Sequence, residues 1–260
     1  MSSALPVFGF VTVHRAPLAN GAAQEAEWLA RAAATGRPGA HLWCAPPGLV
    51  VPKGYRRLPA FDAACAASAA AGWPVQVRES GGGLVPQGPG LCNLSLVWRG
   101  EGAMPSGTDA IYRELSDGLA AAFARLGVVT ATHAVEGSFC DGRFNLAVNG
   151  RKLVGTAQAW KRIAGQPAVL AHAVVVVSAD LQVLTAAANH FEAAAGSGRR
   201  YRADALTSVA EAWCAAHGGT PLPTPDLEAQ VLTALAERFA RSVPLHIHDG
   251  GPRGFRSHSS

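Results

Sequence analysis

The chain lacks the features that mark secreted, membrane-spanning and metal-binding proteins. Residues 1–13 hold no charged segment followed by a long apolar run, so no secretory signal is expected. The longest apolar run, residues 168–177, is broken by His172 and is too short to span a bilayer. The five cysteines form no Cys-x-x-Cys pair, which argues against a zinc site and against a disulfide framework. We therefore expect a cytoplasmic protein with no metal centre and no membrane partner.

Charge is also scarce. Asp, Glu, Lys and Arg make up 15% of the 260 residues and hydrophobic residues 49%, so a large core can form and disorder is not expected. The formal net charge of +4 favours an acidic partner. The basic residues form no run and do not alternate with aromatics, which argues against nucleic acid. We expect one catalytic domain over residues 1–241 and a flexible tail over residues 242–260.

The hydrophobic patterns predict an α+β fold with mixed β-sheets flanked by helices. Helices are expected over residues 22–34, 60–71, 108–126, 181–188, 204–216 and 226–241. Strands are expected over residues 6–13, 41–44, 48–51, 75–78, 92–98, 128–133, 143–148, 152–161 and 169–177. Gly150 supplies a turn between two of these strands.

A thiol and an amine lie on either side of one expected strand. Residues 137–146 are Gly-Ser-Phe-Cys-Asp-Gly-Arg-Phe-Asn-Leu, and residues 149–158 are Asn-Gly-Arg-Lys-Leu-Val-Gly-Thr-Ala-Gln. Cys140 can carry an acyl group as a thioester, and Lys152 can exchange a proton or steady charge at the carbonyl. A reactive cysteine needs positive neighbours, which Lys152 and Arg143 can supply. The pattern is typical of acyl transfer.

A glycine-rich loop follows the expected strand 75–78. Backbone N–H groups in such a loop can approach a ligand closely or bind an anion. By itself the loop also suits a flexible turn, and it matches neither a phosphate-binding loop nor a dinucleotide-binding motif. The candidate binding residues here are Arg78, Ser80, Gly81, Gly82 and Gly83.

The ordered combination of these motifs resembles the biotin/lipoate ligase superfamily, and within it the lipoate–protein ligase A and octanoyltransferase branch. The resemblance covers roughly residues 30–240 and implies a class II ligase-like catalytic domain. It implies that Arg78 and the glycines line an acyl or adenylate pocket and that Lys152 faces the acyl carbonyl. The further binding residues are Asn93, Gly155, Thr156, Ala157, Gln158 and His172.

The cysteine segment is most similar to that of the octanoyl-[glycine cleavage H protein] amidotransferases, in which a Cys precedes the Lys by this spacing. The ligases usually carry a His-Asp pair where this chain has Gln87 and Gly88, and often a small C-terminal domain for which too little sequence follows Arg241. We therefore expect an acyltransferase that attaches an octanoyl or lipoyl group to a lysine of an acidic lipoyl carrier domain. The carrier is of the glycine cleavage H protein or 2-oxoacid dehydrogenase E2 type, and no cofactor is required.

Two alternative functions are also consistent with the sequence. An ATP- and Mg²⁺-dependent ligase would pass through a lipoyl-adenylate made from free lipoate, with Cys140 uninvolved. A non-catalytic member would bind lipoate or a lipoyl carrier without turnover. An acyl carrier protein stays open as the acyl donor. Single residues also have plainer roles: Lys152 as a solvated side chain, His172 as a hydrogen-bonded core histidine, and Asn93 as a loop cap.

Overall fold

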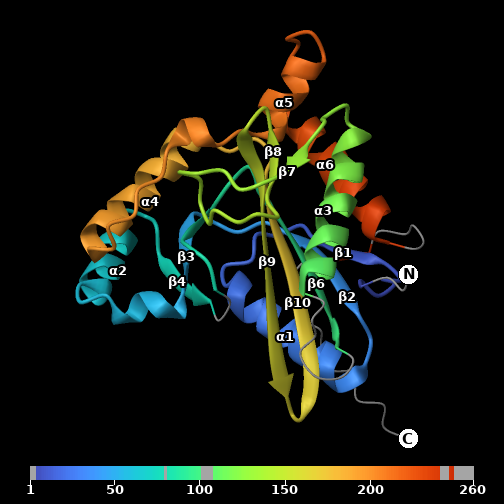
Figure 1. Ribbon diagram of the computed structural model, residues 1–260, viewed down its shortest axis with the longest axis horizontal. Coiled ribbons are helices and arrows are strands. Elements are labelled where there is room, and N and C mark those ends of the chain that lie inside the picture. The colour runs from blue at the N-terminus through green and yellow to red at the C-terminus, as the bar shows by residue number, and fades with distance from the viewer. Residues whose placement is uncertain (1–3, 79–80, 101–107, 241–245, 249–260) are drawn as a thin grey trace, which may run out of the picture.

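The computed structural model describes residues 4–78, 81–100, 108–240 and 246–248 (Figure 1). Within them a large mixed sheet and a small sheet are flanked by helices, which confirms the expected α+β class. The large sheet has the strand order β11 (His246–His248), β1 (Val11–His14), β2 (Gly39–Trp43), β6 (Leu91–Arg99), β10 (Gln166–Val176), β9 (Arg151–Ile163), β8 (Leu146–Val148) and β7 (Ala131–Thr132). Strand β1 runs parallel to both of its neighbours, and the other pairs are antiparallel.

Two tight turns build the antiparallel half of the large sheet. Asn149 and Gly150 join β8 to β9, and Ala164 and Gly165 join β9 to β10. All four have positive φ angles, of 49°, 75°, 47° and 79° in that order. Two successive positive φ values are typical of the type I′ turn, whose twist matches that of the paired strands. The expected turn at Gly150 is confirmed.

Strand β6 is central, and all its residues except Arg99 are buried. On one face Leu94 and Leu96 pack in the main core beneath α3 (Thr108–Ala124) and α6 (Thr224–Phe239). On the other face Val97 packs against Leu29 of α1 (Gly21–Thr35). Because side chains alternate along a strand, Asn93 and Ser95 also lie on the α1 face. The α1 face of β6 therefore carries two buried polar side chains.

The small sheet consists of β4 (Val75–Arg78), β3 (Gly48–Pro52) and β5 (Val85–Gln87), with β3 parallel to β4 and antiparallel to β5. Helices α2 (Phe61–Ala70) and α4 (Leu181–Ala195) cover it, on the left of Figure 1. A second core joins the two sheets, because Leu91 and Val176 of the large sheet share it with Leu49 and Leu184. The remaining short elements are η1 (Lys53–Arg57), η2 (Ala203–Ala205) and α5 (Val209–Ala216).

Several boundaries differ from those expected. The strand expected at 143–148 begins only at Leu146, because Asn145 turns back to donate its backbone N–H to the Gly142 carbonyl. The helix expected at 204–216 is split, and α5 begins after Ser208, whose hydroxyl accepts the Glu211 N–H. Strands β5 and β11 were not expected, and β11 lies within segment 242–260, whose other residues are outside the described ranges. No helix in the described ranges is both long and apolar enough to cross a membrane.

Candidate active site

A hollow lies between the two sheets. It holds about 560 Å³ of space not filled by atoms, part of which is open to solvent. Its apolar wall includes Val85, Leu91, Val174, Val176, Leu184 and Leu206. Five polar side chains border the same space: Arg78, Cys140, Lys152, Thr156 and His172. An apolar lining with a few polar groups is the usual character of a binding site for a small apolar group.

Cys140 lies in the loop between β7 and β8 and is half-buried. Its φ angle is 49°, a left-handed conformation that non-glycine residues rarely adopt. The Cys140 carbonyl accepts hydrogen bonds from Asn145 Nδ2 at 3.0 Å and from Lys152 Nζ at 2.9 Å, and its Sγ accepts the Gly83 N–H at 3.5 Å. These three hydrogen bonds hold Cys140 in a strained backbone conformation. Residues with such strained backbone conformations cluster at functional sites.

Lys152, the second residue of β9, is only 5% exposed. Its Nζ donates to the carbonyl oxygens of Phe139 and Cys140, so the amine is held directly against the cysteine segment. The pKa of Lys152 is lowered to about 8, mainly by burial; the charges of Cys140 and Asp141 oppose this change, and the charge of Arg78 adds to it. An amine in this environment can gain and lose a proton near neutral pH, which a solvated lysine does not do.

The glycine loop packs directly on the sulfur. Gly82 has φ +104°, and a Cβ at this position would lie 2.6 Å from Cys140 Sγ and 3.0 Å from Arg78 Nη2. Arg78 Nη2 donates to the carbonyl oxygens of Gly81 and Gly83, each at 2.9 Å, and so fixes the loop from within the hollow. Only a residue without a side chain permits this approach.

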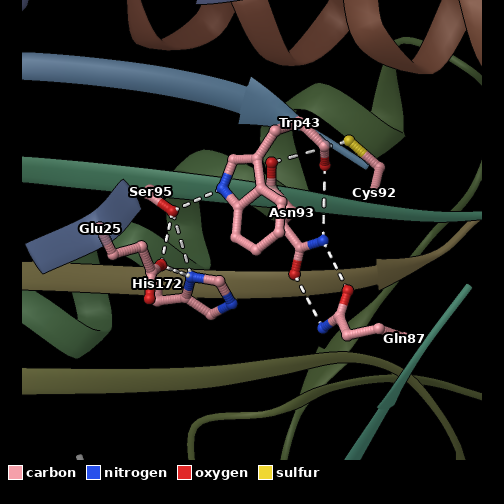
Figure 2. A network of polar contacts seen from close by, with 7 residues as sticks. All are labelled: Glu25, Trp43, Gln87, Cys92, Asn93, Ser95 and His172. Carbon is pink, nitrogen blue, oxygen red and sulfur yellow. Dashed lines mark hydrogen bonds and ion pairs between the residues drawn. The ribbon is translucent and has the colours of Figure 1, made fainter. Parts of the chain in front are cut away.

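A chain of polar groups lies on the α1 face of the large sheet (Figure 2). His172 Nδ1 is 2.5 Å from Glu25 Oε1, and Ser95 Oγ donates to the same carboxylate oxygen at 2.7 Å. Trp43 Nε1 donates to Ser95 Oγ at 2.9 Å. Burial raises the pKa of Glu25, but the charge of His172 and the hydrogen bonds from His172 and Ser95 outweigh it, so the pKa ends below its ordinary value. Glu25 is therefore a carboxylate inside the fold.

The structure brings most of the expected site residues together. Arg78, Cys140, Lys152, Gly155, Thr156, Ala157 and His172 border the hollow, and Gly82 and Gly83 contact Cys140. Ser80 lies outside the described residues. Gly155 approaches Lys152 closely, since a Cβ there would meet Nζ at 3.1 Å.

Three expected residues do not face the hollow. Asn93 is fully buried and exchanges two hydrogen bonds with Gln87, of 3.1 and 2.9 Å, so its amide is already satisfied (Figure 2). Gln158 Nε2 donates to the Thr108 carbonyl at 2.8 Å at the start of α3. Arg143 is exposed and pairs with Asp109 at 2.5 Å, an interaction that competes with any approach to Cys140. The side chains of Asn93, Gln158 and Arg143 are therefore bonded to other parts of the fold and not to a group in the hollow.

Glu25 is not among the site residues expected from the sequence. In the helical pattern, Glu25 stands four residues before the buried Leu29 and seven before the buried Ala32, so it lies on the helix face that packs against the sheet. A carboxylate on a buried face needs a partner, and this spacing was the signal that could have found it. No group of three or more His, Cys, Asp or Glu side chains in the described part of the chain is placed to hold a metal ion.

Comparisons with known proteins show which family the chain is similar to. The model of the lipoyl protein ligase A/B catalytic domain matches residues 16–236. An uncharacterized protein of Cupriavidus necator is 46% identical over 223 residues, which cover 81% of this chain and 86% of that protein. An octanoyl-[GcvH]:protein N-octanoyltransferase of Kyrpidia tusciae is 36% identical over 190 residues, which cover 69% of this chain and 64% of the transferase.

Among solved structures, a lipoate-protein ligase A bound with ATP superimposes with a TM-score of 0.62. The match covers 94% of this chain and 87% of that one, at 15% sequence identity. A likeness at this identity shows that the two chains share the class II ligase-like catalytic fold.

Proposed function

Because the chain belongs to the lipoyl protein ligase A/B catalytic-domain family, whose members are enzymes, we propose that it moves an octanoyl or lipoyl group onto a lysine of a lipoyl carrier domain. The acyl group is held as a thioester on Cys140, and Lys152 exchanges the proton. The observation that carries the proposal is the joint placement of both residues. They border one apolar hollow, with the Lys152 amine bonded to the Cys140 carbonyl and the Gly83 N–H bonded to the sulfur.

This geometry suits a covalent route. A thioester is more easily attacked by an amine than an amide is, so a cysteine carrier divides one difficult transfer into two easier steps. The neutral Lys152 amine takes the proton of the attacking thiol and gives it to the departing amine. The Gly83 N–H lies beside the sulfur, where it can stabilise the oxyanion that develops during each step.

The apolar hollow and the positive charge favour the named substrates. A saturated acyl chain is stabilised by apolar walls, roughly in proportion to the surface that it buries. The name of the Kyrpidia tusciae relative specifies octanoyl-GcvH as its donor, which supports the glycine cleavage H protein as donor or acceptor here. The formal net charge of +4 favours an acidic carrier.

Position 87 bears on the ATP-dependent alternative. The resemblance implies a His-Asp pair in ligases where this chain has Gln87 and Gly88. Gln87 is buried, neutral and bonded through both amide atoms to Asn93, so it offers no carboxylate and no free imidazole. This departure favours a transferase that needs no nucleotide.

Intact-mass spectrometry tests the proposal. Incubation with octanoylated H protein, without ATP, is expected to add one octanoyl group to the enzyme, and an apo lipoyl domain added afterwards is expected to remove it. Peptide mapping should place the group on Cys140. Transfer that instead requires ATP and free lipoate, with release of pyrophosphate, would favour the ligase. Tight carrier binding without any turnover would favour a non-catalytic subunit.

A methyl group at Gly82 is expected to disable the same step. In Gly82→Ala the new Cβ conflicts with Cys140 Sγ, and the φ angle of +104° is strained for alanine. Because displacement of a reacting group by about 1 Å costs up to about 10²-fold in rate, we expect acyl-enzyme formation to slow by about that factor. Stopped samples analysed by mass spectrometry give the rate.

Gly54→Ala is the matched control for this change. A Cβ at Gly54 meets no atom within 4 Å, its φ angle is not in the positive range, and it does not border the hollow. The control enzyme should form the acyl-enzyme at the unmodified rate. If the two alanine variants behave alike, the close approach of Gly82 to the sulfur has no functional meaning.

A further inference from the structure

A carboxylate–imidazole pair that the covalent route does not use lies at the edge of the hollow, and its imidazole forms part of the wall. Glu25 comes from α1 and His172 from β10, and their side chains are only 15% and 16% exposed, respectively. Two further elements hold the pair, since Ser95 of β6 donates to Glu25, and Trp43 of β2 donates to Ser95. Four separate segments of the chain thus converge on one buried ion pair.

The pair lies between two spaces. His172 borders the apolar hollow, whereas Glu25 borders a second, open groove between α1 and β4 that holds about 1180 Å³. Arg78 borders both spaces. The groove also carries Arg56 and Lys161, whose positive charges suit an acidic carrier surface. A lysine presented from this groove would meet Glu25 and His172 on its way to Cys140.

The orientation of the imidazole leaves one nitrogen for chemistry. His172 Nδ1 donates to Glu25 Oε1, which fixes the ring and the tautomer. Figure 2 shows the other ring nitrogen turned away from Glu25. Among the described residues, no hydrogen bond to that second nitrogen, Nε2, is recorded. A carboxylate behind an imidazole in this way holds the ring in the orientation and tautomer in which Nε2 can accept a proton.

The proposed reaction needs such a base. A carrier lysine is an ammonium ion at neutral pH and cannot attack a thioester until it loses a proton. Lys152 is poorly placed to take this proton, because its Nζ is bonded to the carbonyls of Phe139 and Cys140 and serves the sulfur. We infer that His172, oriented by Glu25, accepts the first proton of the acceptor lysine. This inference rests on the proposed function.

The protons and bonds then balance. The acceptor ammonium gives one proton to His172 Nε2, and the resulting amine attacks the Cys140 thioester carbon. As the C–N bond forms and the C–S bond breaks, the second proton passes through Lys152 to the departing sulfur. The third proton remains on the new amide nitrogen. His172 releases its proton to solvent, and the free thiol and neutral lysine of the enzyme are restored.

Comparing two nucleophiles distinguishes His172 as a proton acceptor from His172 as a purely structural residue. The enzyme is first charged with a small thioester, octanoyl-N-acetylcysteamine, whose leaving thiol needs no proton from His172. The charged enzyme then meets either an apo lipoyl domain or hydroxylamine, which is already a neutral amine at pH 7.5. In His172→Gln we expect transfer to the lipoyl domain to slow by about 10²-fold, the usual contribution of a general base, and transfer to hydroxylamine to be unchanged.

Glu25 is a positioning residue. In Glu25→Gln we expect transfer to the lipoyl domain to slow by a smaller factor than in His172→Gln, and transfer to hydroxylamine to be unchanged. Added imidazole should partly restore lipoyl-domain transfer in His172→Ala, an effect that a core-packing role would not produce. Glu27→Gln and His190→Gln are the controls, because both residues are exposed and Glu27 lies on the same helix as Glu25. Thermal unfolding of every variant identifies any that has lost its fold.

The outcomes are distinct. A wild-type enzyme that never becomes charged overturns the proposed function and this inference with it. A charged wild-type enzyme and a charged His172→Gln enzyme that transfer equally fast to the lipoyl domain overturn only the role of the pair. If His172→Gln loses both transfers to the same extent, the histidine supports the hollow and accepts no proton. If it does not fold, Glu25→Gln decides by the same comparison.

Discussion

Replacement of Cys140 by alanine is expected to abolish the acyl-enzyme and to lower carrier acylation by at least about 10³-fold. In the proposed route the acyl group is bonded to the sulfur, and the Gly83 N–H that contacts this sulfur cannot form that bond itself. Intact-mass spectrometry checks for the adduct, and gel-shift or mass analysis of the lipoyl domain gives the rate. Cys140→Ser, which keeps an acceptor for the Gly83 N–H, should be almost as inactive because a serine is a far weaker nucleophile here.

Cys214→Ala is the matched control for the thiol. Cys214 is half-buried like Cys140 but lies on α5, away from the hollow, and alanine is well tolerated in a helix. Its activity should equal that of the unmodified enzyme. If Cys140→Ala retains more than about a tenth of the activity, the thioester route is wrong and the ATP-dependent alternative must be tested first.

Replacement of Lys152 by methionine is expected to slow acyl-enzyme formation by about 10²- to 10³-fold and to change its pH dependence. In the unmodified enzyme the Cys140–Lys152 pair must lose one proton to become reactive. Because burial lowers the pKa of Lys152 to about 8, the rate should rise with pH up to about 8 and level off above it. Rates of acylation measured from pH 6 to pH 10 test this, and the limb near pH 8 should be absent in Lys152→Met.

The methionine variant needs a stability measurement beside it. Loss of the amine leaves the carbonyls of Phe139 and Cys140 without this donor, which costs about 1–3 kcal/mol for each group that stays unsatisfied. The removal of a buried ammonium offsets part of that cost. Lys53→Met, at an exposed position outside the hollow, is the control. A folded Lys152→Met enzyme with an unchanged pH limb would show that another group titrates in the reaction.

The sequence predicted the elements whose signals are local. Gly150 lies in a turn with two positive φ angles, and helix α1 ends where Gly36 adopts φ 71°. The Cys-to-Lys spacing also placed both groups at one hollow, because the β8–β9 turn returns the chain directly alongside the cysteine loop. These features depend on residues close to one another in the chain, so a pattern can show them.

The parts that could not be predicted depend on distant partners. Asn93 was expected at the ligand, but Gln87 of the small sheet occupies its amide, and nothing near Asn93 in the chain signals that pairing. The role proposed for Glu25 depends on its ion pair with His172, a residue of a strand in the other half of the chain. A single sequence shows that a carboxylate lies on a buried helix face, but not which cation meets it there.

The buried central strand β6 has a consequence for the order in which the protein folds. Strand β6 pairs with β2, made earlier in the chain, and with β10, made much later, so that Asn93 lies beside Trp43 while Leu91 lies beside Val176. Such distant pairings form late, because long loops must close before they are stabilised. Arg78, Lys152 and His172 therefore converge only as folding is completed. During synthesis Cys140 leaves the ribosome before Lys152, the amine proposed to take the proton of its thiol, so the nascent cysteine is made before that amine is in place.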